Sequence, residues 1–235
     1  MIALVKEKII SPLIHLFYPH ICSGCGSDLL DETDFLCYKC FYDLPYTSFE
    51  YYVDNSAEKL FHGRINLQAC SATFFFVKDS IIQNCIHELK YKDNQKLGIY
   101  LGRIMGERLK NSGRFDEVEL IVPLPLNKIR EKQRGYNQAA LIAKGIAEEL
   151  NVPVIENNMI RVQNTKSQTK KDNLDRWLNV KDAFKINDPR PFLNKNILLV
   201  DDVLTTGATL EACSNALLKI PGIKLSIATL AKSST

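Results

Sequence analysis

From residue 68 onwards, short apolar runs alternate with segments whose apolar residues recur every three to four positions. Short runs rich in apolar and β-branched residues are typical of strands, and the longer recurrence is typical of helices with one buried face. The predicted strands are residues 71–77, 120–123, 152–155, 159–162, 197–200 and 224–230. The predicted helices are residues 81–89, 97–109, 137–150 and 208–219. Because strands and helices alternate, the sequence predicts an α/β domain with a mostly parallel sheet.

Two stretches lack this alternation. Residues 1–20 are apolar in part, but charged residues and two prolines interrupt them, and a membrane span needs about 20 consecutive apolar residues. We predict a short amphipathic helix there, in preference to a helix on a membrane surface. Without a secretory signal the chain is expected to be cytoplasmic, with a peripheral position at the inner membrane face as the alternative. Residues 163–176 show no apolar periodicity and are predicted to form an exposed loop.

Composition narrows the class of protein but not its ligand. The chain has 235 residues, of which 46% are hydrophobic and 24% charged, as in an ordinary globular protein of one or two domains. Thirty Lys and Arg against 27 Asp and Glu leave a net charge of +3. A field this weak does not by itself indicate nucleic-acid binding, so a site for an anionic ligand has to be argued from local placement.

Four of the seven cysteines form two closely spaced pairs near the N-terminus. Each Cys-x-x-Cys turn, Cys22 with Cys25 and Cys37 with Cys40, offers two thiolates to one metal ion, and two such turns suit tetrahedral Zn²⁺. A pair of redox-active or disulfide-forming dithiols is the alternative. The remaining cysteines stand alone in apolar surroundings and are predicted to be small buried hydrophobic residues. They are Cys70, Cys85 and Cys213.

The end of the predicted strand at residues 197–200 carries the most informative polar residues. Asp201 and Asp202 follow it, and the turn Thr205-Thr206-Gly207-Ala208-Thr209 leads into a helix. In α/β sheets, ligands bind at the carboxyl ends of the strands. Amides and hydroxyls of the turn can bind a phosphate monoester, and the carboxylates can accept hydrogen bonds from ribose hydroxyls that also coordinate Mg²⁺. The pattern predicts a sugar-phosphate site, with a solvated helix cap as the alternative.

This segment, ILLVDDVLTTGAT, resembles the phosphoribosyl pyrophosphate (PRPP) loop of type I phosphoribosyltransferases. Ala208 is one departure, because many members of that group have a second glycine there. The segment IVPLPLNKIREKQRGYNQ, residues 121–138, resembles the hallmark segment of one branch of the group, the ComF family of ComFC- and GntX-like proteins. The order of the other parts also matches: a Tyr-Pro pair before the cysteines, the segment HELKYK at 87–92, and the PRPP loop last.

The resemblance covers nearly the whole chain and implies a type I phosphoribosyltransferase fold with a mostly parallel sheet. Residues 1–67 would form an N-terminal helix and a small zinc-binding region with four cysteine ligands, and residues 68–235 the PRPP-binding domain. Mg²⁺ would accompany PRPP, and Zn²⁺ would be structural.

PRPP carries phosphate groups at both ends of its ribose, so its site needs a second, basic part. Arg130 and Arg134 follow the Pro-x-Pro segment and are expected on the pyrophosphate side, because guanidinium groups bind phosphate oxygens in bidentate fashion. For the residues at 128–132, a solvated run of charges is the alternative. The family resemblance also implies a flexible hood that closes over the reacting carbon. After Arg161, its residues would be Thr165, Gln168 and Arg176.

The resemblance implies a role in DNA uptake during natural transformation, with PRPP, single-stranded DNA and a DNA translocation helicase as partners. Aromatic and basic residues beside the cysteines could stack on bases, with core packing around the metal as the alternative. These residues are Tyr38, Lys39, Phe41, Tyr42 and Tyr46.

Two other functions stay open. One is a nucleotide-salvage phosphoribosyltransferase that transfers the phosphoribosyl group from PRPP to a nitrogen nucleophile. The other is an interaction module held together by zinc alone, which the intact acidic pair of the PRPP loop disfavours. No residue in the sequence identifies the pocket of the nucleophile, so whether PRPP is turned over is left open.

Overall fold

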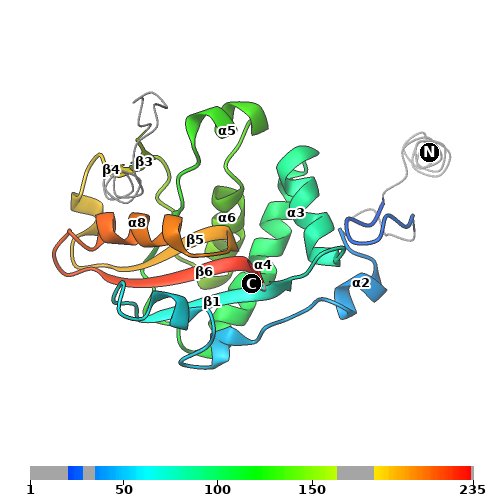
Figure 1. The fold of residues 1–235 in the computed structure, drawn as a ribbon, viewed down its shortest axis with the longest axis horizontal. Helices are drawn as coiled ribbons and strands as arrows, with labels where there is room; N and C mark the ends of the chain where they lie inside the picture. Colours follow the sequence, from blue (N-terminus) through cyan, green and yellow to red (C-terminus); the bar gives the residue numbers. More distant parts are fainter. Residues whose placement is uncertain (1–20, 29–34, 163–182, 234–235) are drawn as a thin grey trace, which may run out of the picture.

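The centre of the molecule is a parallel sheet with the strand order β1-β6-β5-β2 (Figure 1). The computed structural model describes residues 21–28, 35–162 and 183–233, apart from the side chain of Lys128. The strands of this sheet are β1 (Ala69–Phe76), β2 (Leu120–Pro123), β5 (Asn196–Leu204) and β6 (Lys224–Ser233). Although β6 is the last strand along the described chain, it lies between β1 and β5. The predicted α/β class with a mostly parallel sheet is confirmed.

Helices cover both faces of this sheet, because its strands are apolar on both sides (Figure 1). In β5, Leu198 and Val200 pack into one hydrophobic cluster, while Ile197 and Leu199 pack into the other, as the alternation of side chains along a strand requires. The first cluster holds residues of α3 (Ile81–Tyr91), α4 (Gln95–Ser112) and α6 (Gln138–Leu150), and the second holds residues of α8 (Ala208–Leu217).

Helices α4 and α6 lie so close together that glycines are required between them. A Cβ atom on Gly102 would collide with the carbonyl oxygen of Ile142, and one on Gly145 would collide with that of Ile99. The GxxxGxxxG spacing of residues 98, 102 and 106 places these glycines on one face of α4. This face allows the two helix backbones to approach each other directly.

Two predicted segments differ from the structure, and two others lie outside the described residues. β5 extends to Leu204, beyond the predicted end at residue 200, because β6 continues to pair with it as far as Leu204 opposite Lys232. The strand predicted at residues 152–155 is wrong, since only an isolated bridge joins Val154 to Ile121. Pro153 has no N–H to donate, which limits pairing there. The loop predicted at residues 163–176 and the helix predicted within residues 1–20 lie outside the described residues.

The predicted strand at residues 159–162 is confirmed as β3 (Met159–Arg161), which pairs antiparallel with β4 (Phe184–Ile186) in a separate two-stranded ribbon. Among the described helices, none combines the length and the apolar character needed to cross a membrane. The remaining elements are short. They are α2 (Tyr38–Tyr42), α5 (Lys128–Arg134) and the 3-10 helices η1 (Phe49–Tyr51), η2 (Glu58–Phe61) and η3 (Arg190–Phe192).

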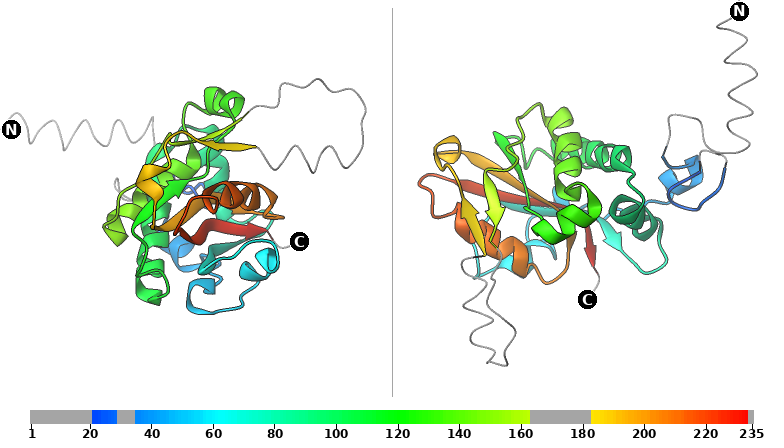
Figure 2. Two further views of the ribbon diagram at one scale, coloured as in Figure 1. Left: turned by 90° about the vertical axis from the view of Figure 1, so that its left-hand side faces the viewer. Right: turned by 90° about the horizontal axis from the view of Figure 1, so that it is seen from above.

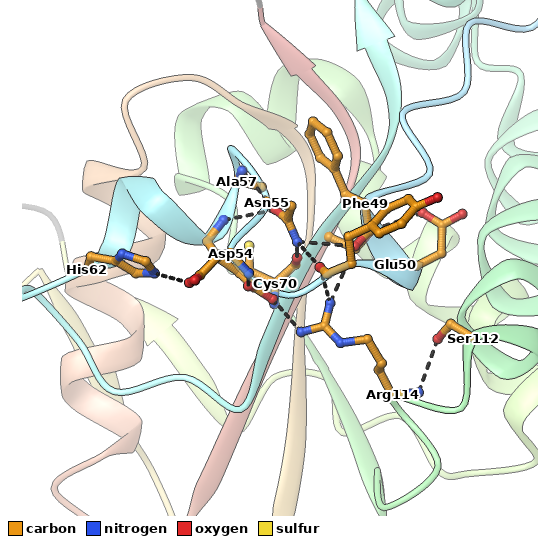
Figure 3. A network of polar contacts seen from close by, with 12 residues as sticks. Phe49, Glu50, Asp54, Asn55, Ala57, His62, Cys70, Ser112 and Arg114 are labelled. Carbon is orange, nitrogen blue, oxygen red and sulfur yellow. Dashed lines mark hydrogen bonds and ion pairs between the residues drawn. The ribbon is translucent and has the colours of Figure 1, made fainter.

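A network of polar contacts fastens the segment before β1 onto the domain (Figure 3). The side-chain amide of Asn55 donates to the carbonyl oxygens of Phe49, Tyr52 and Cys70, at 2.9–3.1 Å. Arg114 pairs with Glu58 at 2.6 Å, and both side chains are largely buried. The segment therefore packs tightly on β1, while the domain boundary at residue 67 stays a prediction.

Candidate ligand-binding cleft and cysteine cluster

The acidic pair lies in the last part of β5, inside the strand and not after it. Asp201 is opposite Thr229 of β6, and the backbone N–H of Asp202 donates to Oδ1 of Asp201 at 2.8 Å. Desolvation raises the pKa of the Asp201 carboxyl well above its ordinary value, and the adjacent Asp202 carboxylate raises it further. The second carboxylate is paired: Nζ of Lys90, in the last turn of α3, lies 2.6 Å from Oδ2 of Asp202.

The small-residue turn between β5 and α8 has the geometry of a helix entrance. Gly207 has φ +75° and precedes the first residue of α8. A Cβ atom there would lie 2.9 Å from the ring of Phe61, so the turn needs glycine for both its conformation and its space. Thr205, Thr206 and Ala208 are exposed, as expected for groups that receive a phosphate from solvent.

Residues 61–64, which lie in and just after η2, contact this turn. Arg64 donates to the carbonyl oxygen of Thr206 at 3.3 Å and pairs with Glu211 in the first turn of α8. Neither Arg64 nor Phe61 was singled out by the sequence analysis, because nothing local in the sequence shows that residues 61–64 reach a turn more than 140 positions later.

The basic stretch after Pro125 forms the short helix α5, which ends at Arg134 before Gly135 at φ +78°. Arg130 and Arg134 are four positions apart and so lie on one face of this helix. Arg134 donates to Oε1 of Gln138 at 2.8 Å, and its guanidinium lies 5.7 Å from the ring centre of Tyr91.

One cleft of about 490 Å³ brings the acidic pair, the turn and the basic helix together. Of the residues predicted for the PRPP site, it is lined by Asp201, Asp202, Thr205, Thr209, Arg130 and Arg134. Thr206, Gly207 and Ala208 belong to the turn but not to the wall of the cleft. The hood residues Thr165, Gln168 and Arg176 lie outside the described residues.

The cleft also contains residues that the sequence analysis did not assign to the site. Gln83, His87 and Lys90 line it from one face of α3, at spacings of four and three residues. Arg161, at the end of β3, lines it as well; the family resemblance had named this residue only as the start of the hood segment. The segment at 87–92 was noted only as part of a family resemblance, and the contact with Asp202 requires the folded chain.

The four paired cysteines form a compact cluster. The sulfur atoms of Cys22, Cys25, Cys37 and Cys40 all lie within 4.8 Å of one another, a spacing that one metal ion can bridge. Two backbone N–H groups, of Gly24 and Cys37, donate to Sγ of Cys22 at 3.4 and 3.2 Å. Hydrogen bonding with Ser27 lowers the pKa of the Cys25 thiol to about 6, which favours the thiolate that a metal binds.

Gly24 is required in this cluster, since a Cβ atom there would lie 2.9 Å from Sγ of Cys40. The prediction for the remaining cysteines is confirmed: they are fully buried, and burial raises their pKa values. They are Cys70, Cys85 and Cys213.

The cysteine cluster is docked on α3, at the opposite end of the molecule from the β3–β4 ribbon (Figures 1 and 2). Oγ of Ser23 donates to Glu88 at 2.7 Å, and the side-chain amide of Asn84 donates to the carbonyl oxygen of Gly24 at 2.7 Å. The helix that bears Lys90 is therefore held in place by the loop that bears the first two cysteines.

The aromatic residues after the cluster divide into two groups. Tyr38 and Tyr42 on α2 are 79% and 74% exposed, with ring centres 5.2 Å apart. Core packing around the metal is therefore wrong for these two. Tyr46 is partly buried instead: it packs against Phe74 of β1, and the guanidinium of Arg108 lies over its ring.

The chain resembles proteins named for competence and DNA utilization. Competence protein F of Haemophilus influenzae is 32% identical over 139 residues, which are 57% of this chain and 61% of that protein. Competence protein ComFC of Bacillus subtilis is 37% identical over 104 residues, 44% of this chain and 40% of that protein. DNA utilization protein YhgH of Escherichia coli K12 is 28% identical over 137 residues, 57% and 60% of the two chains. The matched parts thus span less than two thirds of each relative.

Two solved structures superpose on part of the chain. A glutamine PRPP amidotransferase from B. subtilis, complexed with ADP and GMP, superposes with a TM-score of 0.41 at 15% identity. A structure described as the allosteric regulatory enzyme of purine biosynthesis gives 0.40 at 16%. Each superposition covers 61% of this chain and 30% of the other. No protein-family model matches the sequence.

Proposed function

We propose that the chain is a member of the ComF family and acts in DNA uptake during natural transformation, binding PRPP with Mg²⁺ and single-stranded DNA. The proposal that the chain binds PRPP rests on the cleft, which is lined by two carboxylates, residues of the turn before α8 and residues of the basic helix α5. These are the groups that a ribose with a phosphate at each end needs.

We propose one orientation for PRPP, with its 5′-phosphate at the turn before α8 and its pyrophosphate at α5. The turn at residues 205–209 would hold the 5′-phosphate through its N–H and hydroxyl groups at the start of α8. Asp201 and Asp202 would accept hydrogen bonds from the ribose hydroxyls, and Arg130 and Arg134 would face the pyrophosphate. Mg²⁺, held beside the two carboxylates through the same hydroxyls, would neutralise charge on the pyrophosphate.

Calorimetric titration with PRPP and Mg²⁺ tests the site. The double variant Asp201→Ala/Asp202→Ala should bind PRPP at least ten- to a hundredfold more weakly, because hydrogen bonds to charged groups each contribute about 1.5–3 kcal/mol. The control is Asp116→Ala/Asp188→Ala, which removes two acidic residues that do not line the cleft. Undiminished affinity in the first double variant would place PRPP elsewhere.

Zinc is the metal we propose for the cysteine cluster. The four sulfur atoms lie close enough together to bind one ion, and four thiolates are a common ligand set of structural zinc. It would hold together a segment too small to have a core of its own. Elemental analysis should find one zinc per chain. Cys37→Ser should lose it, while Cys213→Ser, at a buried cysteine outside the cluster, should retain it; zinc retained at full occupancy in Cys37→Ser would contradict the assignment.

Single-stranded DNA is proposed as the second ligand because exposed aromatic rings and basic groups are both available. Tyr38 and Tyr42 are largely exposed aromatic residues, and base stacking contributes about 1–3 kcal/mol per base. Arg130 and Lys132 on α5 are exposed cations. The second basic stretch, at residues 166–171, lies outside the described residues. A DNA translocation helicase remains the protein partner that the family resemblance implies.

Fluorescence anisotropy with a labelled oligonucleotide, at low and at physiological salt, tests DNA binding. Tyr38→Ser/Tyr42→Ser should weaken it at both salt concentrations, whereas binding that ignores the tyrosines and disappears at physiological salt would be typical of purely ionic contacts. If no oligonucleotide binds at low salt, or if a nitrogen base releases pyrophosphate from PRPP, the salvage transferase becomes the better assignment.

A further inference from the structure

Lys90 occupies one of the two carboxylates that the proposed ligand needs. Its ammonium lies 2.6 Å from Oδ2 of Asp202, and the two side chains are only 21% and 16% exposed. In the free protein, Asp202 therefore already has a counterion, while Asp201 has no cation paired with it among the described residues.

The backbone that carries Lys90 is fixed on two sides. Asn84 and Glu88 hold α3 to the loop of the cysteine cluster, through Gly24 and Ser23. At the end of the helix, the hydroxyl of Tyr136 donates to the carbonyl oxygen of Leu89 at 2.7 Å. A change in the contact with Asp202 is thus a change in the Lys90 side chain, which has four rotatable bonds and a single charged end.

Bound PRPP would remove this counterion from its place. Ribose hydroxyls compete with the ammonium for the oxygens of Asp202, and a divalent cation on the same hydroxyls repels it. The other charged residues that line the cleft from α5 and β3 are cations. Because the ribose hydroxyls would engage Asp201 as well as Asp202, the pyrophosphate of the ligand is then the anion left for the Lys90 ammonium.

We propose that Lys90 exchanges partners, pairing with Asp202 in the free protein and with the pyrophosphate of PRPP in the complex. The inference rests on the proposed function. The exchange makes Lys90 a specificity-determining residue. A ribose phosphate without pyrophosphate breaks the Lys90–Asp202 pair and offers the ammonium no new anion, whereas PRPP offers it the pyrophosphate.

Calorimetric titration with two probes, PRPP and ribose 5-phosphate, each with Mg²⁺, tests the exchange. Lys90→Met should weaken PRPP binding at least about tenfold, the effect of losing one charge-assisted hydrogen bond. Ribose 5-phosphate should bind Lys90→Met as well as the wild type, or more tightly, because Asp202 is no longer occupied. Lys90→Arg should retain most of the preference for PRPP, since it keeps the charge.

Lys92→Met is the matched control. Lys92 lies two residues later, is 56% exposed and pairs with Glu88, and it does not line the cleft. It should change neither affinity. The circular dichroism spectrum of each variant establishes that it is folded, and Lys90→Gln serves as a second neutral variant.

Two results overturn the exchange while leaving the proposed function standing. Equal weakening of both probes by Lys90→Met would mean that Lys90 only positions Asp202. Unchanged PRPP affinity would mean that it does not contact the pyrophosphate. If the wild type does not bind PRPP in the presence of Mg²⁺, the proposed function itself fails, and the exchange with it.

Discussion

At the scale of single residues, ionised Asp201 lowers the free energy of unfolding, because its carboxyl is desolvated in the folded protein. A carboxyl whose pKa is higher in the folded than in the unfolded chain stabilises the fold while it is protonated. That contribution is complete below the unfolded pKa and is lost as the pH rises through the folded pKa. A desolvated acid near the carboxyl end of an inner strand is typical of a residue retained for binding.

Asp201→Asn should therefore stabilise the protein, and more so as the pH rises. Thermal unfolding between about pH 5 and pH 8 should show a gap between variant and wild type that widens with pH, while PRPP affinity falls. Asp188 provides the opposite case, because its hydrogen bonds with Arg190 lower its pKa. Asp188→Asn should not stabilise the protein at neutral pH, and a pH-independent gap for Asp201→Asn would contradict the buried acid.

Asn55 is the residue whose loss should most disturb the segment before β1. Its side-chain NH₂ group donates hydrogen bonds to three carbonyl oxygens, and its Oδ1 accepts from the N–H groups of Ala57 and Glu58. Asn55→Ala leaves buried groups unsatisfied and should lower the free energy of unfolding by at least about 2 kcal/mol. His62→Ala is the control in the same network (Figure 3), since its pair with Asp54 at 3.5 Å is exposed. Chemical denaturation of both variants measures the difference.

At the scale of secondary-structure elements, the contact between α4 and α6 depends on the absence of side chains. Gly102→Ala would push a methyl group into the carbonyl of Ile142. Overpacking of this kind costs about 1–3 kcal/mol, or a melting temperature lower by about 2–4 °C for each kcal/mol. Lys110→Ala, on the exposed side of the same helix, should leave the melting temperature nearly unchanged. Equal melting temperatures for Gly102→Ala and the wild type would mean that the helices can separate at no cost.

The elements that were predicted well are those whose signal is local. β2 is an apolar run ended by Pro123, and α6 has a continuous apolar face after Asn137, so both were placed within one residue. The extension of β5 through Asp201 and Asp202 could not be predicted, because polar residues normally end a strand and the pairing that continues it comes from β6. Likewise, Lys90 and Arg64 reach the site only through the tertiary fold.

At the scale of the whole molecule, the two proposed ligands share one basic element. The exposed cations of α5 lie on the helix that lines the cleft. DNA and PRPP should therefore influence each other's binding, and linkage requires the effect to be equal in both directions. Anisotropy titrations of the oligonucleotide with and without saturating PRPP measure the coupling. Identical affinities would assign DNA to the aromatic residues on α2, which do not line the cleft.

The position of β6 has a consequence for how the chain is made. β6 is the last strand of the described chain to leave the ribosome, and it must insert between β1 and β5. Until it does, the edges of β1 and β5 that face it have no pairing strand. Long-range parallel pairing is slow to form, and open edges invite aggregation. We therefore expect the acidic pair on β5 to reach its native strand pairing late in folding.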